Sequence, residues 1–438
     1  MRSGVAEESV VIPPGRRRGR GDAVAAVCAQ LSQAAASFLL QVLAARELGA
    51  KGLGTFALLY GFIVLGTAIS TGLVGDSLTV LDRRTPRVRA GLAQWAVGAA
   101  TLGAFVATSA TYVAGYLPLG AACLGGLACA VFMLEDVLRR ALMACGRFWA
   151  LVGVDASSLV VSVGVVLVWR AIEPVTITTF VVALLAGQVI AGGVALVVLP
   201  PDERGGLVAR QPARREVWDY GVWRALQQGL RPAMMAGVRV LVTAVVGLAA
   251  FGALDAARVY VAPAMLVVSG VGSYLFASYA RDARAEPAVA MRRADKGAGL
   301  LFVLTTLAGV CAVALLPVLG GLVTGGRFDM SALAVTGWAA YAAATAIVTP
   351  YGSLAAVRGG QVMVFVIRSA ESALGIAVAV VLLTTTGGAD WVPLGLAGGA
   401  LVSGVLLRRA ARTAGRVKPA SSAGETVRIA TNAGNSSG

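Results

Sequence analysis

The sequence predicts an all-α, polytopic membrane protein of about 12 transmembrane helices, and three observations carry that prediction. Of the 438 residues, 58% are hydrophobic and only 13% are charged, whereas about 25% of a soluble globular chain is charged. The mean hydropathy is +0.80. Apolar runs of roughly 20 residues, the length that crosses a bilayer as a helix, recur along the whole chain. Since a helix satisfies its own backbone hydrogen bonds in lipid, we expect each run to be helical.

Twelve such runs divide into two groups of six, separated by a basic segment. In order they cover approximately 23–45, 54–80, 91–113, 119–138, 149–169, 176–199, 225–250, 255–280, 298–318, 331–357, 362–384 and 392–408. The predicted organisation is a basic tail (1–21), an N-terminal lobe (22–199), a basic linker (200–224), a C-terminal lobe (225–408) and a tail expected to be disordered (409–438).

The distribution of positive charge predicts that both ends of the chain face the cytoplasm. With that orientation, 29 of the 37 Lys and Arg residues fall in cytoplasmic segments, as the positive-inside rule requires. The few basic residues assigned to outer loops are Arg46, Lys51, Arg170, Arg258 and Arg327. We expect the basic inner segments to meet anionic lipid headgroups and not nucleic acid.

The two groups of spans show signs of an internal repeat. An offset of 198 residues places Gln30 on Gln228, Gly49 on Gly247, Gly54 on Gly252, Gly72 on Gly270 and Arg83 on Arg281. Because each group has an even number of spans, the copies would share one orientation, as in transporters with parallel repeats. Coincidence among glycine-rich helices is the alternative.

Polar residues form a stripe along the first span and along the seventh. The first stripe consists of Gln30, Gln33, Ser37 and Gln41, and the seventh span repeats the spacing with Gln228, Arg231 and Arg239. Residues three and four apart share a helix face, which we expect to point away from lipid. One interpretation is a pair of helices that offers amides and guanidiniums to an anionic solute. The other is hydrogen bonding between helices.

Acidic residues inside spans are candidates for ion coupling. Glu371 lies three residues from Arg368 in the eleventh span, and Asp155 lies in the fifth. Either acid could pair with an arginine of the seventh span, and Glu371 could also simply neutralise Arg368. We expect Asp76, Glu135 and Asp136, near the ends of their spans, to be solvated charges.

Several classes of chemistry lack the residues they need. The chain has no His, which removes histidine metal ligands and Ser-His or Cys-His catalytic pairs. It has no G-x-x-x-x-G-K-[ST] loop for ATP. Its five cysteines fall in apolar stretches without ligand spacing and are expected to be small buried hydrophobes. We therefore expect no metal, no cofactor and no enzymatic activity, with a membrane glycosyltransferase as the remote alternative.

Three segments resemble lipid-linked oligosaccharide flippases of the Wzx type. The first, QLSQAAASFLLQVLAARELGAKGLGTFALL at 30–59, matches an "AR-x-LG" helix end and a "G-x-F/Y" restart. The second, VVGLAAFGALDAARVYVAPAML at 245–266, is similar to the restart after the seventh helix, although Leu254 replaces the expected aromatic residue. The third, GADWVPLGLAGGALVSGVLLRR at 388–409, resembles the closing helix.

This resemblance implies the multidrug/oligosaccharidyl-lipid/polysaccharide (MOP) exporter superfamily. It implies two six-helix lobes that form a V around a central cavity and work by alternating access. It also implies an undecaprenyl-pyrophosphate-linked glycan as substrate, with Arg231 and Arg239 on the helix whose cations meet the pyrophosphate. The expected location is a bacterial-type cytoplasmic membrane, with a polysaccharide polymerase or glycosyltransferases as partners. The alternatives are a peptidoglycan-precursor flippase and a drug or small-molecule antiporter, and the latter should carry compact cavity acids and aromatics.

Overall fold

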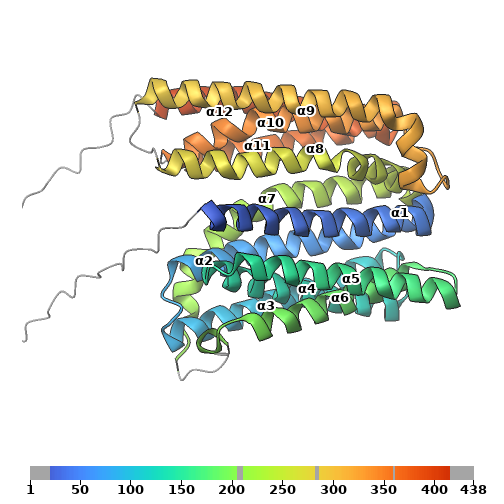
Figure 1. The fold of residues 1–438 in the computed structure, drawn as a ribbon. Helices are drawn as coiled ribbons and strands as arrows, with labels where there is room; N and C mark the ends of the chain where they lie inside the picture. Colours follow the sequence, from blue (N-terminus) through green and yellow to red (C-terminus); the bar gives the residue numbers. More distant parts are fainter. Residues whose placement is uncertain (1–19, 205–210, 282–285, 359–360, 415–438) are drawn as a thin grey trace, which may run out of the picture. The chain divides into compact units, whose positions relative to one another are not determined.

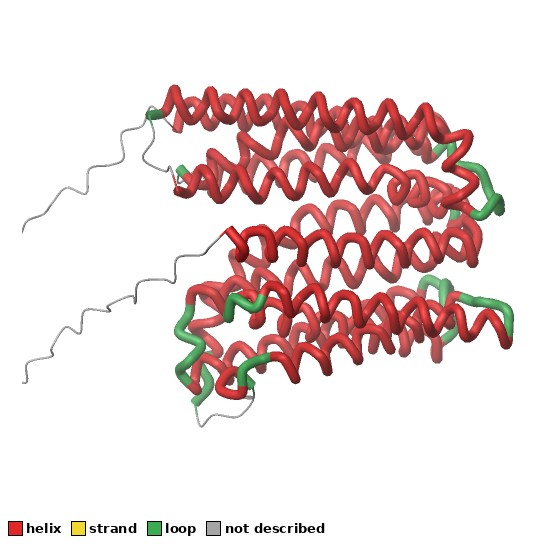
Figure 2. Tube along the Cα trace, in the orientation of Figure 1, coloured by secondary structure: helices red, strands yellow, loops and turns green. Residues whose placement is uncertain are grey.

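The computed structural model describes residues 20–204, 211–281, 286–358 and 361–414. Within these ranges every regular element is helical (Figure 2). Most of the two expected tails, 1–21 and 409–438, and residues 205–210 of the expected linker lie outside the described residues. The chain divides into two compact units, Met1–Pro232 and Ala233–Gly438. We call them the first unit and the second unit.

The helices of the first unit run along its long direction (Figure 1). In order, the elements are α1 (Arg20–Ser70), the π-helical turn η1 (Thr71–Gly75), α2 (Asp76–Val80), α3 (Pro86–Val113), α4 (Leu119–Ala144), α5 (Phe148–Ile172), α6 (Ile177–Val198) and the short 3₁₀ turn η2 (Pro201–Glu203). The helix α7 (Arg214–Val246) begins in this unit and continues into the second. Helix α5 packs against α6 and α1, and α4 packs against α3 and α6.

The second unit contains the rest of α7 and five further helices. These are α8 (Leu248–Arg281), α9 (Pro287–Thr324), α10 (Ala332–Val357), α11 (Gln361–Thr386) and α12 (Val392–Ala414), with the 3₁₀ turn η3 (Ala389–Trp391) before α12. Helix α10 is the centre of this unit, because it packs against α8, α9 and α12. Its sequence is rich in alanine and glycine, which lets its neighbours approach closely.

Eleven helices in the described part of the chain are long and apolar enough to cross a membrane. The first of them, α1, has 51 residues and a break at Gly49, where φ is 65° and ψ is −176°. A continuous helix of that length would be about 76 Å long at about 1.5 Å per residue, more than twice the hydrocarbon thickness of about 30 Å. The break therefore separates two spans, and the fold has the predicted twelve.

The break at Gly49 has a counterpart in the second half of the chain. Gly247, the residue paired with Gly49 by the offset of 198, separates α7 from α8 and also has a positive φ, 96°. Both glycines have a positive φ, and both lie at the junction between the first two helices of their half. The sequence pairing alone did not show this backbone similarity. This likeness supports the internal repeat.

A π-helical turn in the second span makes room for the first half of α7. All five residues of η1 are buried. A side chain at Gly72 would collide with the backbone of Arg224 and Ala225, so only glycine permits this contact. The hydroxyl of Ser77 donates a hydrogen bond of 2.7 Å to the carbonyl oxygen of Leu73 in this turn.

Large apolar side chains are exposed along several helices. Helix α9 shows this clearly, because Leu300, Val303, Leu307 and Val310 are all more than half exposed. Monomeric soluble proteins rarely expose contiguous apolar surfaces of this kind. With the twelve spans, this surface identifies a multi-pass membrane protein whose outer faces contact lipid.

Candidate functional site

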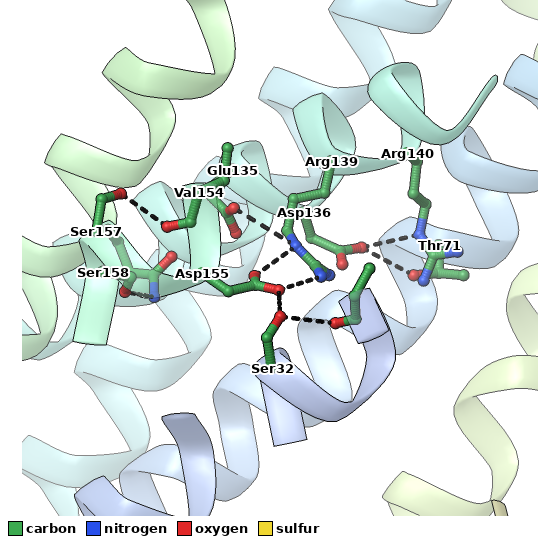
Figure 3. Close-up of polar contacts among 12 residues, drawn as sticks. Ser32, Thr71, Glu135, Asp136, Arg139, Arg140, Val154, Asp155, Ser157 and Ser158 are labelled. Carbon is green, nitrogen blue, oxygen red and sulfur yellow. Dashed lines mark hydrogen bonds and ion pairs between the residues drawn. The ribbon is translucent and has the colours of Figure 1, made fainter. Parts of the chain in front are cut away.

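A buried cluster of charged residues lies in the first unit, at Arg139 of α4 (Figure 3). The Nε atom of Arg139 lies 3.0 Å from Oδ1 of Asp155, and its Nη2 donates a hydrogen bond of 3.1 Å to Oδ2 of the same carboxylate. Nε also lies 3.8 Å from Oε1 of Glu135, one helical turn earlier on α4. All three side chains are at most 6% exposed. Two carboxylates therefore share one guanidinium away from water.

The hairpin of α4 and α5 brings these charges together. Gly146, with φ of 73°, reverses the chain between the two helices, and the N–H of Arg147 donates to the carbonyl of Leu142. Arg139 and Asp155 lie about two turns from this reversal, on either side of it. Ser32 of α1 completes the cluster with a hydrogen bond of 2.6 Å from its hydroxyl to Oδ2 of Asp155.

A second ion pair lies next to the cluster on α4. Asp136 accepts a hydrogen bond of 3.0 Å from Nε of Arg140 and another of 3.0 Å from the hydroxyl of Thr71 (Figure 3). Thr71 is the first residue of η1, so this pair joins α4 to the π-helical turn. The side chain of Arg140 is 31% exposed, whereas that of Arg139 is buried.

A small polar cavity adjoins the cluster. Its polar lining comprises Gln33, Ser37, Tyr60, Glu135, Asp155, Ser158, Ser162 and Gln188, from four helices. Its volume is about 40 Å³, which is room for about three water molecules at roughly 10–15 Å³ each. Gln188 donates a hydrogen bond of 3.0 Å to Ser158, but its buried Oε1 has no hydrogen-bond partner among the described residues. The cavity can therefore hold water or a small ion, and in this conformation it is too small for a drug-sized molecule.

This cluster corrects the expectation that Glu135 and Asp136 are solvated end charges. Glu135 is 3% exposed and Asp136 is 5% exposed. Arg139, which was assigned to a cytoplasmic segment, is equally buried. Asp76 is partly buried and pairs with Arg224 at 3.4 Å. The spacings Glu135–Arg139 and Asp136–Arg140, four residues each, were the signal in the sequence, because such pairs neutralise each other within one helix.

The polar stripe of the first span divides between the cavity and other surroundings. Gln33 and Ser37 line the cavity, where the hydroxyls of Ser37 and Tyr60 lie 2.8 Å apart. Gln41 donates from Nε2 to the backbone carbonyl of Ser37 at 3.0 Å. Gln30 is exposed. Asp155, expected to be a coupling candidate, lines the same cavity as Gln33 and Ser37 and accepts a hydrogen bond from Ser32 of α1.

The second unit also holds a charged cluster. It has one carboxylate and two guanidiniums, whereas the cluster at Arg139 has two carboxylates and one guanidinium. Asp255 of α8, 2% exposed, accepts hydrogen bonds of 2.7 and 3.2 Å from Arg258. Nη2 of Arg239 lies 4.0 Å from Oδ1 of the same carboxylate. Glu371 and Asp155 were the acids expected near the arginines of the seventh span, and the carboxylate found beside Arg239 is that of Asp255. Arg258 was assigned to an outer loop, but it lies within α8 because this helix begins at Leu248.

The remaining candidates are placed as follows. Gln228 and Arg231 lie on α7 in the first unit and are exposed. Arg368 and Glu371 form the anticipated pair on α11, with 4.0 Å between Nη1 and Oε2. Among the described residues no group of three or more His, Cys, Asp or Glu side chains could hold a metal ion.

Comparison with solved structures identifies the fold. A multidrug resistance MATE family transporter of the MOP superfamily, in its inward-facing conformation, superposes with a TM-score of 0.66 at 14% identity, over 91% of this chain and all of that one. The outward-facing conformation of such a transporter gives 0.61 at 12% identity, over 91% and 97% of the two chains. The chain has the fold of a MOP superfamily transporter.

A third MOP structure extends the comparison. The MOP superfamily transporter from Pyrococcus furiosus gives a TM-score of 0.62 at 11% identity, over 90% of this chain and 95% of that one. No family profile matches the sequence, and no curated protein matches it. The likeness to MOP transporters covers both units, and at these identities it is a likeness of fold.

Proposed function

We propose that this chain is a secondary transporter that moves a lipid-linked, anionic glycan across the cytoplasmic membrane by alternating access. In this proposal both termini are cytoplasmic, and an ion gradient supplies the energy because the sequence has no ATP-binding loop. The MOP fold supports the transport class, since similar structures adopt inward-facing and outward-facing conformations.

One observation carries the ion-driven part of the proposal. Two carboxylates and one guanidinium, Glu135, Asp155 and Arg139, are buried beside a cavity of about 40 Å³. Together they carry one net negative charge when all are ionised. Ionisable groups inside the membrane are costly and mark ion pathways and relays. A site of this size and charge fits the exchange of a small cation.

The proposal of an anionic substrate is based on the cationic and amide residues of the polar stripes. Gln228, Arg231 and Arg239 repeat at helical spacing along α7, and guanidiniums bind phosphate oxygens in a bidentate manner. The three-segment resemblance to Wzx-type flippases favours an undecaprenyl-pyrophosphate-linked glycan as that anion. A polymerase or glycosyltransferases are then the proposed partners, and anionic headgroups the proposed surroundings of the basic loops.

A drug or small-molecule antiporter is the second candidate, and a specific observation favours it. Tyr60 and Phe132, whose ring centroids lie 6.3 Å apart, line the same cavity as Glu135 and Asp155. Acids with aromatics are the groups that bind organic cations. The MATE structures come from multidrug resistance transporters. The MOP transporter of P. furiosus is described with a binding pocket of reverse polarity that suggests a different function, so pocket polarity differs among proteins of this fold.

Transport into proteoliposomes separates the two candidates. We expect translocation of a lipid-linked pyrophosphoryl oligosaccharide and no uptake of an organic cation such as ethidium. Arg231→Gln or Arg239→Gln keeps hydrogen-bond donors while removing charge, and at least one should lower glycan transport about tenfold, or about 1.4 kcal/mol. Arg214→Gln, a change of one among many exposed charges, is the matched control. Normal glycan transport in both variants would show that the arginines are structural.

The ion-driven part has its own test. In Glu135→Gln and Asp155→Asn we expect accumulation driven by an imposed pH or Na⁺ gradient to fall at least about tenfold, because the neutral side chain cannot exchange a cation. Movement of substrate down its own gradient should persist. Asp219→Asn, which removes an exposed acid from α7, should leave both unchanged. Gradient-driven accumulation that survives in both cluster variants would exclude these carboxylates as the coupling groups.

A further inference from the structure

Arg139 occupies the position between two carboxylates where a metal cation could sit. It contacts Asp155 through two nitrogens, at 3.0 and 3.1 Å, and approaches Glu135 at 3.8 Å. Its side chain is 3% exposed. A buried guanidinium held in this way is a cation that the protein supplies from its own chain.

Several side-chain oxygen atoms lie close to the two carboxylates that hold Arg139. The Ser32 hydroxyl contacts Asp155 at 2.6 Å, and Ser158 and Gln188 line the cavity beside both acids. Oε1 of Gln188 is buried without a hydrogen-bond partner in the described part of the chain. Carboxylate, amide and hydroxyl oxygens are the ligands that hard cations such as Na⁺ and Ca²⁺ prefer.

We infer that Arg139 is a built-in substitute for a metal cation and determines which ion this site exchanges. With the guanidinium in place the site has one net negative charge, and a proton can neutralise it while the larger ion is excluded. Without the guanidinium the same oxygens carry two negative charges and form a site for a hard metal cation. This inference rests on the proposed ion-driven transport, since it names the ion.

The neighbouring pair provides an internal comparison. Arg140 contacts a single carboxylate, Asp136, and its side chain is 31% exposed. Removing Arg140 leaves one buried carboxylate, to which the Thr71 hydroxyl still donates a hydrogen bond. Removing Arg140 tests the effect of a lost positive charge alone. Removing Arg139 tests, in addition, whether a cation site forms.

Thermal unfolding of the purified full-length protein in detergent tests the inference. We compare NaCl, CaCl₂ and choline chloride at constant ionic strength, using wild type, Arg139→Met, Arg139→Lys and Arg140→Met. In Arg139→Met, Na⁺ or Ca²⁺ should raise the unfolding temperature by at least about 3 °C over choline, because a ligand that binds only the folded state stabilises it. Wild type, Arg139→Lys and Arg140→Met should respond by less than about 1 °C.

A double variant covers the case in which Arg139→Met does not fold. Arg139→Met with Asp155→Asn removes one carboxylate as well, so it should fold and lose the response to cations. If Arg139→Met fails in every cation while the double variant folds, the oxygens cannot accept a metal ion and the inference is overturned. It is equally overturned if Arg139→Met folds without a cation response, or if wild type responds as strongly.

This measurement needs no transport assay. Gradient-driven accumulation that survives in both Glu135→Gln and Asp155→Asn would exclude these carboxylates as the coupling groups and leave the cation response of Arg139→Met as measured. Conversely, a missing cation response would refute the role of Arg139 and leave ion-driven transport standing. The two proposals can therefore fail separately.

Discussion

The carboxylate of Asp255 pairs with guanidiniums from two helices, α7 and α8. Its contacts with Arg258 of α8 are short, and Arg239 of α7 reaches it at 4.0 Å. The carboxylate is 2% exposed. A buried acid holding two arginines stabilises the junction of α7 and α8, because removing one partner of a buried ion pair leaves uncompensated charge in a region with little water.

Asp255→Asn should therefore destabilise the protein strongly. The substitution keeps size and removes the negative charge, and we expect a loss of about 3 kcal/mol in the free energy of unfolding. Thermal unfolding in detergent, read together with the amount of folded protein in the membrane, measures it. Asp219→Asn on α7 is the control, because its pair with Arg215 is highly exposed and such pairs contribute roughly 0–1 kcal/mol. Equal effects of the two variants would contradict the role assigned to Asp255.

Charged residues inside the helices could be predicted in part from the sequence. The spacings Glu135–Arg139 and Asp255–Arg258 place partners on one helix face, and this much is local. The contact between Arg139 and Asp155 depends on how α4 and α5 face each other, and their burial depends on α1 as well. No spacing along one helix contains that information, so the cluster was missed.

At the scale of the element, helix junctions depend on a few glycines. Gly49 has φ of 65° and ψ of −176°, a combination that is essentially restricted to glycine. It separates the first two spans, and Gly247, which also has a positive φ, separates α7 from α8. Glycine at these two positions is a requirement of the backbone.

Gly49→Ala should destabilise the first unit by about 1–3 kcal/mol, because a Cβ atom is strained at this backbone conformation even though the space around it is open. The unfolding temperature in detergent and protease sensitivity of the segment around residues 46–51 report the effect. Gly98→Ala provides the comparison, since Gly98 lies inside α3 with nothing within 4 Å of an added Cβ. That change should be neutral or stabilising by up to about 1 kcal/mol. A neutral Gly49→Ala would show that the junction relaxes to another conformation.

Helix existence was largely predictable, and helix ends were less so. Apolar runs and intervening charges placed all twelve spans, because crossing the bilayer constrains length and composition locally. Helix α9 runs from Pro287 to Thr324, well beyond the expected 298–318. Its first turns carry charged residues that hydropathy excludes, although Pro287 at the start and left-handed Gly325 at the end mark its true limits.

At the scale of the whole molecule, an even number of spans places both ends of the chain on one side of the membrane. The break at Gly49 is what makes the number even, since α1 then contributes two spans. The excess of basic residues in the segments between alternate spans assigns that side to the cytoplasm in our proposal.

Accessibility tagging of single cysteines, in a background without the five native ones, tests this topology. Positions Lys51, Arg170 and Arg327 should react with a membrane-impermeant maleimide in intact cells, because the proposed topology places them on the outer side of the membrane. Positions Arg87, Arg214, Arg293 and Arg416 should react only after the membrane is opened. Labelling of any of these four in intact cells would contradict the even number of spans.

The sequence by itself determined that this protein is a helical membrane protein and how many spans it has. These properties follow from composition, run length and spacing, which act locally along the chain. Only the tertiary structure decided that Arg139 lies between Glu135 and Asp155, and that Asp255 is a partner of Arg239. The contacts of Arg139 with Asp155 and of Arg239 with Asp255 join different helices, and a charge is stable inside a membrane protein only where packing brings it to an opposite one.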